Sequence, residues 1–502
     1  MQIRSRSRLA SGVFGLSLVA SVTLGSCGGN GSGTYLPADA ATAGGSGGAS
    51  GAASQAGNAG DGAATGGAGA GGSAGSSAGS GGSPGPCQGL ACQQTTCTTG
   101  NCTQEPCAAG LVTTVSGTVY DPAGKVPLYN ATVYVPNGPA LPATPGASCN
   151  PCGPALEDAI ASARTDARGS FVLQDVPVGT DIPLVIQIGK WRRRITVPTV
   201  TACADTLLID VNQTRLPRNK SEGEIPLIAI ATGGGDSMEC LPLRMGIDPS
   251  EFTTETGDGR IHLFSGTDVN NEIATKAFAP TLNGGATLTP ATGLWSGLDT
   301  LARYDVVILS CEGGTQEADK PPSARQSMYD YASLGGRVFA SHWHHIWLSA
   351  GPTPLLGIGT WSDRLDPIDP TLGTINGSFA KGQAFADWLF NVGASTTLGE
   401  LVIYAPRDNI QAVSSAEVTS WLTLQNTEQP ESPNSVQYLS FNTPLGVAEE
   451  QKCGRIDYTS LHVSATGNDF PGEPFPDGCE LRDLSAQEKA LEFQLFDLPA
   501  CP

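Results

Sequence analysis

The chain has 502 residues, enough for about two to four domains. It carries 27 Lys and Arg against 47 Asp and Glu, a formal net charge of −20, and nucleic-acid binders need the opposite sign to displace counterions from phosphate. This balance excludes DNA or RNA as the main partner. The 14 cysteines are too many for a reducing compartment without a metal array to hold them, so we expect an exported protein.

Residues 1–26 have the pattern of an export signal. Arginines at positions 4, 6 and 8 precede an apolar stretch from Leu9 to Leu24 that is too short for a permanent anchor. The stretch ends in Leu-Gly-Ser-Cys at 24–27, which resembles the lipobox of bacterial lipoproteins. The resemblance implies cleavage before Cys27 and acylation of that residue, the alternative being an ordinary signal peptide with a chance cysteine. Gly28 in place of Asp favours a lipid-anchored protein of the outer membrane or cell surface of a two-membrane bacterium.

Residues 27–86 are mostly Gly, Ala and Ser with almost no charge. Such a composition cannot bury enough apolar surface to fold, so it predicts a flexible tether. Residues 87–110 follow, with cysteines at every fifth position: Cys87, Cys92, Cys97, Cys102 and Cys107. Because this segment contains no His, we predict a disulfide-stapled knob rather than a zinc site.

Eight further cysteines are assigned structural, disulfide-bonded roles: Cys149, Cys152, Cys203, Cys240, Cys311, Cys453, Cys479 and Cys501. Five cysteines cannot all pair within the knob. One of them therefore either pairs with a cysteine of the body, as we call the residues after the knob, or keeps its thiol. Cys311 lies at a predicted strand end, where a nucleophile could stand, but in an oxidising compartment a disulfide is favoured.

Residues 111–214 alternate apolar and polar side chains in short bursts separated by turn signals, the pattern of a small antiparallel β-sandwich. The runs Val115-Ser-Gly-Thr-Val-Tyr-Asp121, Leu128-Tyr-Asn-Ala-Thr-Val133 and Thr165-Asp-Ala-Arg-Gly-Ser-Phe171 resemble the carboxypeptidase regulatory-like, transthyretin-type domain. The resemblance implies a non-catalytic spacer or binding module. The basic run 190–194 either pairs with the protein's own carboxylates or contacts anionic glycans, lipid headgroups or a partner.

Residues 225–502 change to strands that alternate with helices, which predicts a parallel sheet. The runs Tyr304-Asp-Val-Val-Ile-Leu309, Tyr331-Ala-Ser-Leu-Gly-Gly-Arg-Val-Phe-Ala-Ser-His342 and Gly454-Arg-Ile-Asp-Tyr-Thr-Ser-Leu-His462 resemble the trehalose-utilisation (ThuA-like) branch of the class I glutamine-amidotransferase-like superfamily. The resemblance implies an α/β flavodoxin-like domain.

Amidotransferases place a nucleophilic Cys at the turn between a strand and a helix, and His342 occupies that place here. Their activating His-x-Glu pair is missing, because His462 is followed by Val463 and Ser464. Glutaminase chemistry is therefore not expected.

Four polar residues follow predicted strand ends, where ligands bind in open parallel sheets: Asp236, Glu312, His342 and His462. His342 and His344, two apart in an extended chain, would face one side, a spacing that suits one metal. The candidate catalytic residues are His342, Glu312 and His462. The candidate metal ligands are His342 and His344, completed by Glu312, Asp236 or His462, for Zn²⁺ or another divalent ion. A metal-free polar pocket, or an aromatic cluster that only packs the core, remains open.

Two functions compete. The first is a lipoprotein that acts as a non-catalytic binding or scaffolding protein, for glycans or a protein partner. The alternative is a secreted metal-dependent or sugar-directed hydrolase with its site around His342. No cofactor is firmly implied.

Overall fold

The computed structural model describes residues 104–108, 110–138, 142–149, 159–269 and 273–500. The predicted signal peptide, Cys27, the tether and most of the Cys-rich segment lie outside the described residues, as do Cys152 and Cys501. Of the helices in the described ranges, none combines the length and the apolar character that a membrane crossing requires.

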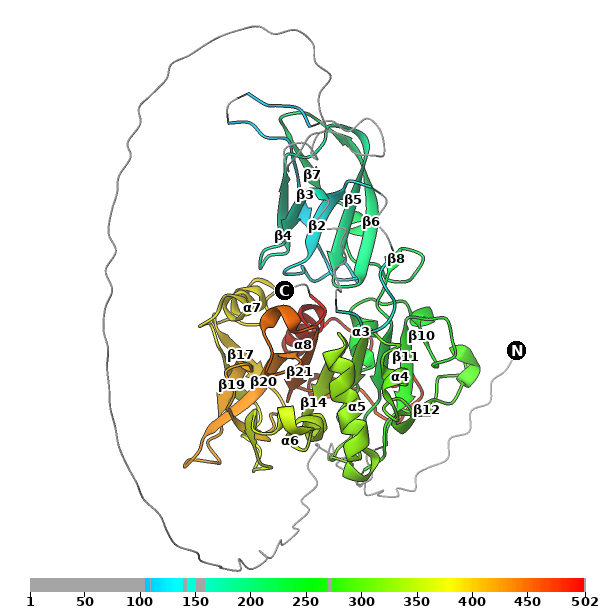
Figure 1. Ribbon diagram of the computed structural model, residues 1–502, viewed down its shortest axis with the longest axis vertical. Helices are drawn as coiled ribbons and strands as arrows, with labels where there is room; N and C mark the ends of the chain where they lie inside the picture. Colours follow the sequence, from blue (N-terminus) through cyan, green and yellow to red (C-terminus); the bar gives the residue numbers. More distant parts are fainter. Residues whose placement is uncertain (1–103, 109, 139–141, 150–158, 270–272, 501–502) are drawn as a thin grey trace, which may run out of the picture. The chain divides into compact units, whose positions relative to one another are not determined.

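The first folded part is a β-sandwich of two sheets (Figure 1). The smaller sheet has the order β4-β1-β7, with β1 (Thr114–Thr118), β4 (Ser170–Gln174) and β7 (Asp205–Leu208). The larger has the order β3-β2-β5-β6-β8, with β2 (Thr132–Pro136), β3 (Ala159–Arg164), β5 (Gly179–Ile188), β6 (Trp191–Val200) and β8 (Gly223–Glu224). The expectation of a β-sandwich is confirmed, but the sheets are not wholly antiparallel, because β1 and β7 pair in parallel.

Alternation of side chains explains the smaller sheet. Val115 in β1 and Phe171 and Leu173 in β4 are buried in the core, while Val172 between them faces outward. Strands β3 and β6 were not predicted, and β6 was overlooked because it begins inside the basic run. The β5–β6 hairpin turns at Gly189, which has φ 53° and whose Cα approaches Pro499 so closely that a Cβ would clash.

The second folded part is built on an eleven-stranded sheet with the order β10-β11-β9-β13-β14-β21-β20-β19-β16-β17, in which β12 also pairs with β11. The strands from β10 to β21 in this order are parallel: β9 (Ile228–Ala231), β10 (Phe252–Thr253), β11 (Ile261–Ser265), β13 (Val306–Leu309), β14 (Arg337–Ser341) and β21 (Gly454–Thr459), as is β12 (Thr289–Pro290). The five central strands lie in the sheet in the order β11, β9, β13, β14, β21. Numbered by their order along the chain, this is 2-1-3-4-5.

The other half of the sheet is antiparallel, which the expectation of a purely parallel sheet did not include. It comprises β16 (Thr371–Ile375), β17 (Glu400–Ile403), β19 (Thr419–Gln425) and β20 (Asn434–Thr443). β15 (Gly359–Trp361) and β18 (Ile410–Val413) form a separate pair. Antiparallel neighbours need no helical crossover, so this region contains fewer helices than the predicted alternation requires.

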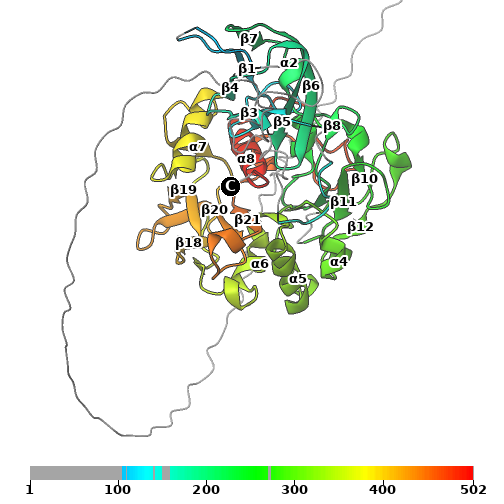
Figure 2. The same ribbon diagram turned by 45° about the horizontal axis from the view of Figure 1, so that its top comes forward.

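The helices are few and short. They are α2 (Val211–Thr214), α3 (Cys240–Arg244), α4 (Leu298–Leu301), α5 (Pro322–Ser333), α6 (Ile346–Ser349), α7 (Ala380–Asn391) and α8 (Ala486–Asp497). Single 3₁₀ turns are η2 (Pro249–Glu251), η3 (Asn283–Gly285), η4 (Ala291–Gly293), η5 (Glu317–Asp319), η6 (His342–His345), η7 (Thr353–Leu355), η8 (Glu449–Gln451) and η9 (Ser464–Thr466). Helix α8 starts with a capping box between Ser485 and Glu488. It packs beside α7, as Figures 1 and 2 show, with the rings of Trp388 and Phe493 5.3 Å apart.

Three disulfides confirm the prediction of an oxidised body: Cys107–Cys203, Cys149–Cys453 and Cys240–Cys479. The first joins Cys107, the last cysteine of the predicted knob, to the sandwich. One knob cysteine thus pairs with the body, which was one of the two alternatives for that segment. The assignment of Cys311 to a disulfide is wrong. Cys311 keeps its thiol at the end of the central strand β13, where the side chain beside its sulfur is the imidazole of His342 and not another cysteine.

Specific contacts join the sandwich to the second part. The ring of Tyr129 stacks on Phe493 at 5.7 Å, and the Trp388 indole donates a hydrogen bond of 2.7 Å to the carbonyl of Pro127. The ammonium of Lys190, at the β5–β6 hairpin, forms a buried ion pair of 2.6 Å with Asp305. Together with the Cys149–Cys453 bridge, these contacts fix the sandwich against the larger sheet.

Candidate functional site

The residues predicted from strand ends gather at one edge of the parallel sheet. Asp236 follows β9, Glu312 follows β13, His342 comes directly after β14 and His462 comes after β21. The carboxyl ends of parallel strands meet at the same edge, so these residues are neighbours although they are far apart in sequence. All four are buried, with at most 2% of their surface exposed.

Cys311, His342 and His462 form the centre of this edge, and we call them the Cys-His-His cluster. One side-chain donor atom of each lies within 4.8 Å of those of the other two. The Cys311 sulfur lies 3.4 Å from Nδ1 of His342. The two imidazole rings lie 5.0 Å apart at an angle of 81°. This arrangement brings one sulfur and two ring nitrogens close together.

The backbone of His342 ends strand β14 sharply. Its φ is 40°, in the left-handed region that costs a non-glycine residue free energy, and the 3₁₀ turn η6 starts there. The surrounding packing must hold this conformation, which directs the ring toward the ends of β13 and β21.

His462 has an unusual environment for a buried imidazole. Within the described part of the chain, neither of its ring nitrogens makes a well-formed hydrogen bond. An unsatisfied buried polar group costs about 1–3 kcal/mol, so something must hold the ring in place. Asp236 holds the backbone that follows the ring. Its Oδ1 accepts hydrogen bonds from the backbone N–H groups of Val463 at 2.9 Å and Ser464 at 3.0 Å. Gln487 adds a 2.8 Å hydrogen bond to the carbonyl of His462.

Burial makes the imidazoles poor bases. It is the largest cause that lowers the pKa of His342 well below its usual value, with smaller effects from His462 and Arg407. Burial and Arg407 lower the pKa of His462 to about 3, against a small opposing effect of the Ser460 backbone. Both rings are therefore neutral at neutral pH, the form in which imidazole binds metals.

Glu312 and His344 were predicted beside His342 but do not join the cluster. Glu312 accepts the backbone N–H of Thr267 at 2.9 Å and forms a buried ion pair with Lys320. His344 donates from Nε2 to the carbonyl of Ser310 at 2.8 Å, and its Nδ1 accepts from the indole of Trp347 at 2.9 Å. Both of its nitrogens are thus engaged, and the residue packs the core.

The expectation that His342 and His344 face one side is wrong. It assumed an extended chain, whereas residues 342–345 form the 3₁₀ turn η6, in which residues two apart point in different directions. Cys311 replaces His344 in the cluster. The rule that pointed to Glu312 applied equally to Cys311 one residue earlier, and only the disulfide assignment hid it.

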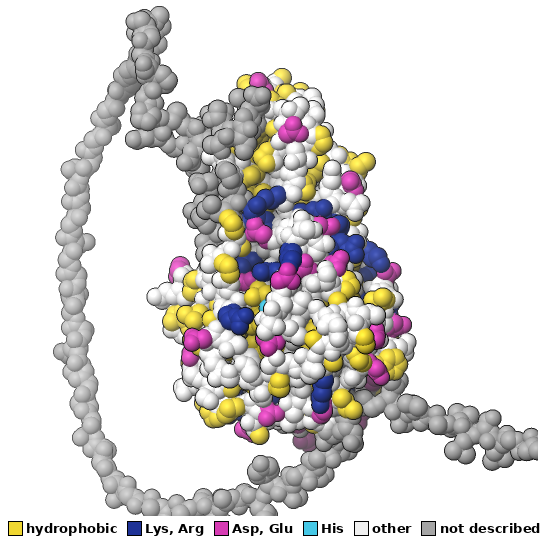
Figure 3. Space-filling model, turned by 90° about the vertical axis from the view of Figure 1, so that its right-hand side faces the viewer, with side chains coloured by type: hydrophobic (Ala, Val, Ile, Leu, Met, Phe, Trp, Pro, Cys, Tyr) yellow, Lys and Arg dark blue, Asp and Glu magenta, His cyan; other side chains and the backbone are white. Residues whose placement is uncertain are grey.

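The basic run pairs largely with the protein's own carboxylates. On the face in Figure 3, Lys and Arg side chains gather in a band with Asp and Glu among them. Glu224 pairs with Arg192 at 3.3 Å and with Arg194 at 2.6 Å. Asp305 and Glu224 thus offset two of the four positive charges of this run, which weakens the interpretation of the run as a contact patch.

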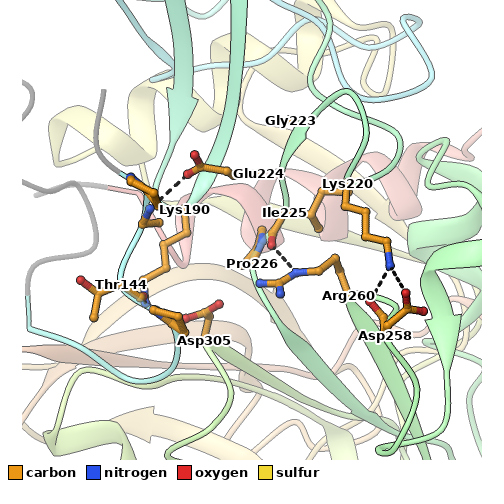
Figure 4. A pocket seen from close by; sticks show the side chains of 13 residues that line it. Thr144, Lys190, Lys220, Gly223, Glu224, Ile225, Pro226, Asp258, Arg260 and Asp305 are labelled. Carbon is orange, nitrogen blue, oxygen red and sulfur yellow. Dashed lines mark hydrogen bonds and ion pairs between the residues drawn. The ribbon is translucent and has the colours of Figure 1, made fainter. Parts of the chain in front are cut away.

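A cavity of about 320 Å³ lies beside this run (Figure 4). Its cationic side chains are already engaged: Lys190 with Asp305 at 2.6 Å, Lys220 with Asp258 at 2.6 Å, and Arg260 with the carbonyl of Ile225 at 2.8 Å. An anion that entered the cavity would therefore have to compete for these three cations with the partners they already hold.

A larger cavity of about 590 Å³ lies among α7, β20 and β21. Arg455 lines it, paired with Asp457 and Asp497 at 2.8 Å each and lying 5.7 Å from the ring centre of Trp421. Nothing in the sequence pattern pointed to it. Neither of these two cavities is lined by a member of the Cys-His-His cluster.

No family model matches the chain, and no curated protein matches it. Two solved structures are similar, both mutants of a type II cohesin–X-dockerin complex from Acetivibrio cellulolyticus. The C-terminal interface mutant is 20% identical over 30% of this chain and 79% of that chain, with a TM-score of 0.14. The N-terminal interface mutant is 19% identical over 27% and 85%, with a TM-score of 0.16. TM-scores this low support no inference about fold or partners.

Proposed function

We propose that this chain is a lipid-anchored surface protein whose folded body binds or scaffolds a protein partner without catalysis. The observation that carries the proposal is the turn after β14. His342 stands there, 1% exposed and in the left-handed conformation, at the position where amidotransferases hold their nucleophilic Cys. Because the imidazole that stands in place of the cysteine is buried, it cannot come within reach of a substrate to attack it in the described conformation.

The domain identities belong to the same proposal. The order second, first, third, fourth, fifth for strands β11 to β21 is that of flavodoxin-like sheets. It supports the resemblance of residues 225–502 to the ThuA-like branch of the glutamine-amidotransferase-like superfamily. The two-sheet sandwich likewise supports the resemblance of residues 111–214 to the carboxypeptidase regulatory-like domain.

The hydrolase alternative has less support. Its proposed centre, His342, is inaccessible to a polymeric or sugar substrate, since the members of the Cys-His-His cluster are between 0 and 2% exposed. A general acid or base must come within hydrogen-bond reach of the substrate, which this burial prevents in the described conformation.

A protein partner fits the outer face of the smaller sheet. Val172 of β4 and Leu207 of β7 flank Ser116 of β1 in register, and they are 53% and 61% exposed. Ile209, two residues beyond Leu207, is 82% exposed. We call Val172, Leu207 and Ile209 the apolar face. Asp205, which accepts hydrogen bonds from Thr114 and Ser116, gives it a polar neighbour. Exposed apolar patches of this kind mark protein-interaction sites.

Site-specific photocrosslinking tests the proposal. A photoreactive phenylalanine analogue replaces Leu207 in the full chain, expressed in its native host. The matched control carries the analogue at Thr196, an exposed strand position on the larger sheet. We expect a discrete protein adduct at position 207 and none at position 196. The absence of an adduct at 207, or the same adducts at both positions, contradicts the assignment of this face.

A further inference from the structure

We infer that the Cys-His-His cluster is a binding site for one zinc ion. This inference goes beyond the proposed binding role, which rests on the outer face of the sandwich and not on this edge of the α/β sheet. The ligands would be the sulfur of Cys311 and one ring nitrogen each of His342 and His462. The set expected from the sequence did not include Cys311. It did include His344, Glu312 and Asp236, whose side chains form other contacts in the structure.

The donor chemistry suits zinc. Zn²⁺ prefers thiolate and imidazole ligands in four-coordinate geometry, and hard ions such as Ca²⁺ and Mg²⁺ require oxygen ligands, which this set does not supply. The donor atoms already lie within 4.8 Å of one another, so small side-chain shifts would bring all three to bonding distance. Binding would exchange the proton of the Cys311 thiol for the metal and release that proton to solvent.

His462 supplies the independent observation. Its ring is 2% exposed, and neither nitrogen has a well-formed hydrogen bond among the described residues. By contrast, the buried ring of His344 has partners on both nitrogens, and that of His262 has Tyr304 on Nδ1. A metal ion on His462 would supply the missing interaction.

The backbone around the cluster is fixed before any ion binds. Asp236 and Gln487 hold the loop that carries His462, and the turn at φ 40° fixes His342. The charge of Arg407 acts on both imidazoles, but Arg407 is paired with Asp366 at 2.8 Å, which reduces its repulsion of a bound cation. A preformed set of this kind loses little entropy on binding.

Metal titration of the full chain, without a His tag or a reductant, tests the inference. Chelator-stripped protein is titrated with Zn²⁺ against a chromophoric chelator, and with Co²⁺ as a spectroscopic probe of thiolate ligation. We expect one ion per chain and a thiolate-to-Co²⁺ charge-transfer band. Disulfides remain intact without reductant, so the band reports on cysteines that keep a thiol.

Three variants and one control assign the ligands. Cys311→Ser removes the band, and His342→Asn and His462→Asn weaken zinc binding by more than about 100-fold, the upper range for changes outside the ligand shell. His262→Asn is the matched control. His262 lies in strand β11, is also buried, and shares a hydrogen bond with the hydroxyl of Tyr304. We expect it to bind as the wild type does. Cys311→Ser changes a single atom and keeps the test valid if a histidine variant does not fold. Substoichiometric binding by the wild type, or a band that survives Cys311→Ser, overturns the inference.

Discussion

The sulfur of Cys311 lies 3.4 Å from Nδ1 of His342, across the ends of the neighbouring parallel strands β13 and β14. A Cys–His pair at this distance resembles the nucleophile and base of a thiol enzyme. Here, however, the histidine stands at the sharp turn after its strand, and both residues are at most 1% exposed. The pair is therefore better suited to hold an ion than to attack a substrate.

The thiol of Cys311 predicts the result of a thiol count. Denatured but unreduced wild-type protein should contain one more reactive thiol than denatured Cys311→Ser, because Cys311 keeps its thiol while the other cysteines of the described residues form disulfides. In the native protein this thiol should react slowly, since it is fully buried. Equal counts for the two denatured proteins would show that Cys311 is oxidised.

Lys190 should contribute strongly to stability. Its ammonium and the carboxylate of Asp305 are almost fully buried, so Lys190→Met leaves an unpaired buried charge. We expect a loss of about 3–5 kcal/mol in the free energy of unfolding, measured with urea. Asp305→Asn in the same background should recover part of this loss, because the side-chain oxygen can still accept the N–H of Leu227. No recovery in the double variant argues against an electrostatic origin.

Asp121 makes the stability of the protein depend on pH. Burial raises its pKa from 3.8 to about 6, against the opposing hydrogen bonds from Val126 and Lys125. Between these values the unfolded chain releases the proton that the folded chain retains, so stability is lost as pH rises. The loss should reach about 2–3 kcal/mol, at about 1.4 kcal/mol per pKa unit.

Asp121→Asn isolates this effect. The Asn oxygen can keep both backbone hydrogen bonds, and the side chain cannot ionise. Its stability relative to wild type should therefore increase by about 2–3 kcal/mol from about pH 4 to about pH 7, measured by urea unfolding at each pH. Parallel pH profiles for the two proteins would refute the raised pKa.

Cys27 should carry the lipid anchor. Cys27→Ser should block lipidation, so that the protein is no longer processed at this site and metabolic labelling with a fatty acid fails. Wild-type protein should be labelled and should fractionate with outer membranes. If the variant remains cleaved and membrane-bound like the wild type, the lipoprotein proposal is wrong.

The sequence allowed much of the fold to be predicted where the hydrophobic pattern was local. Alternation in residues 170–174 and the apolar run that includes 306–309 lie in strands β4 and β13. Strand β6 was missed because its charged residues resemble a solvated surface. They lie in a strand because partners distant in sequence, such as Asp305 for the adjoining Lys190, neutralise them.

The site could be predicted only in part. The rule that ligands bind at the carboxyl ends of parallel strands pointed to His342 and His462, which do meet. It could not distinguish them from Glu312, whose charge is paired with Lys320, because that pairing depends on the folded structure. The geometry of η6 was equally hidden, since a run of His and Trp residues has no strong preference between an extended chain and a 3₁₀ turn.

X-ray absorption at the zinc edge of the zinc-loaded full chain tests the central claim most directly. The cluster predicts a first coordination shell with one sulfur at about 2.3 Å and imidazole nitrogens at about 2.0–2.1 Å, the latter with the outer-shell scattering of the rings. Cys311→Ser should lose the sulfur and keep the imidazole signal of any zinc that remains. A wild-type shell without sulfur, or one with several sulfurs and no imidazole, would contradict a site built from Cys311, His342 and His462.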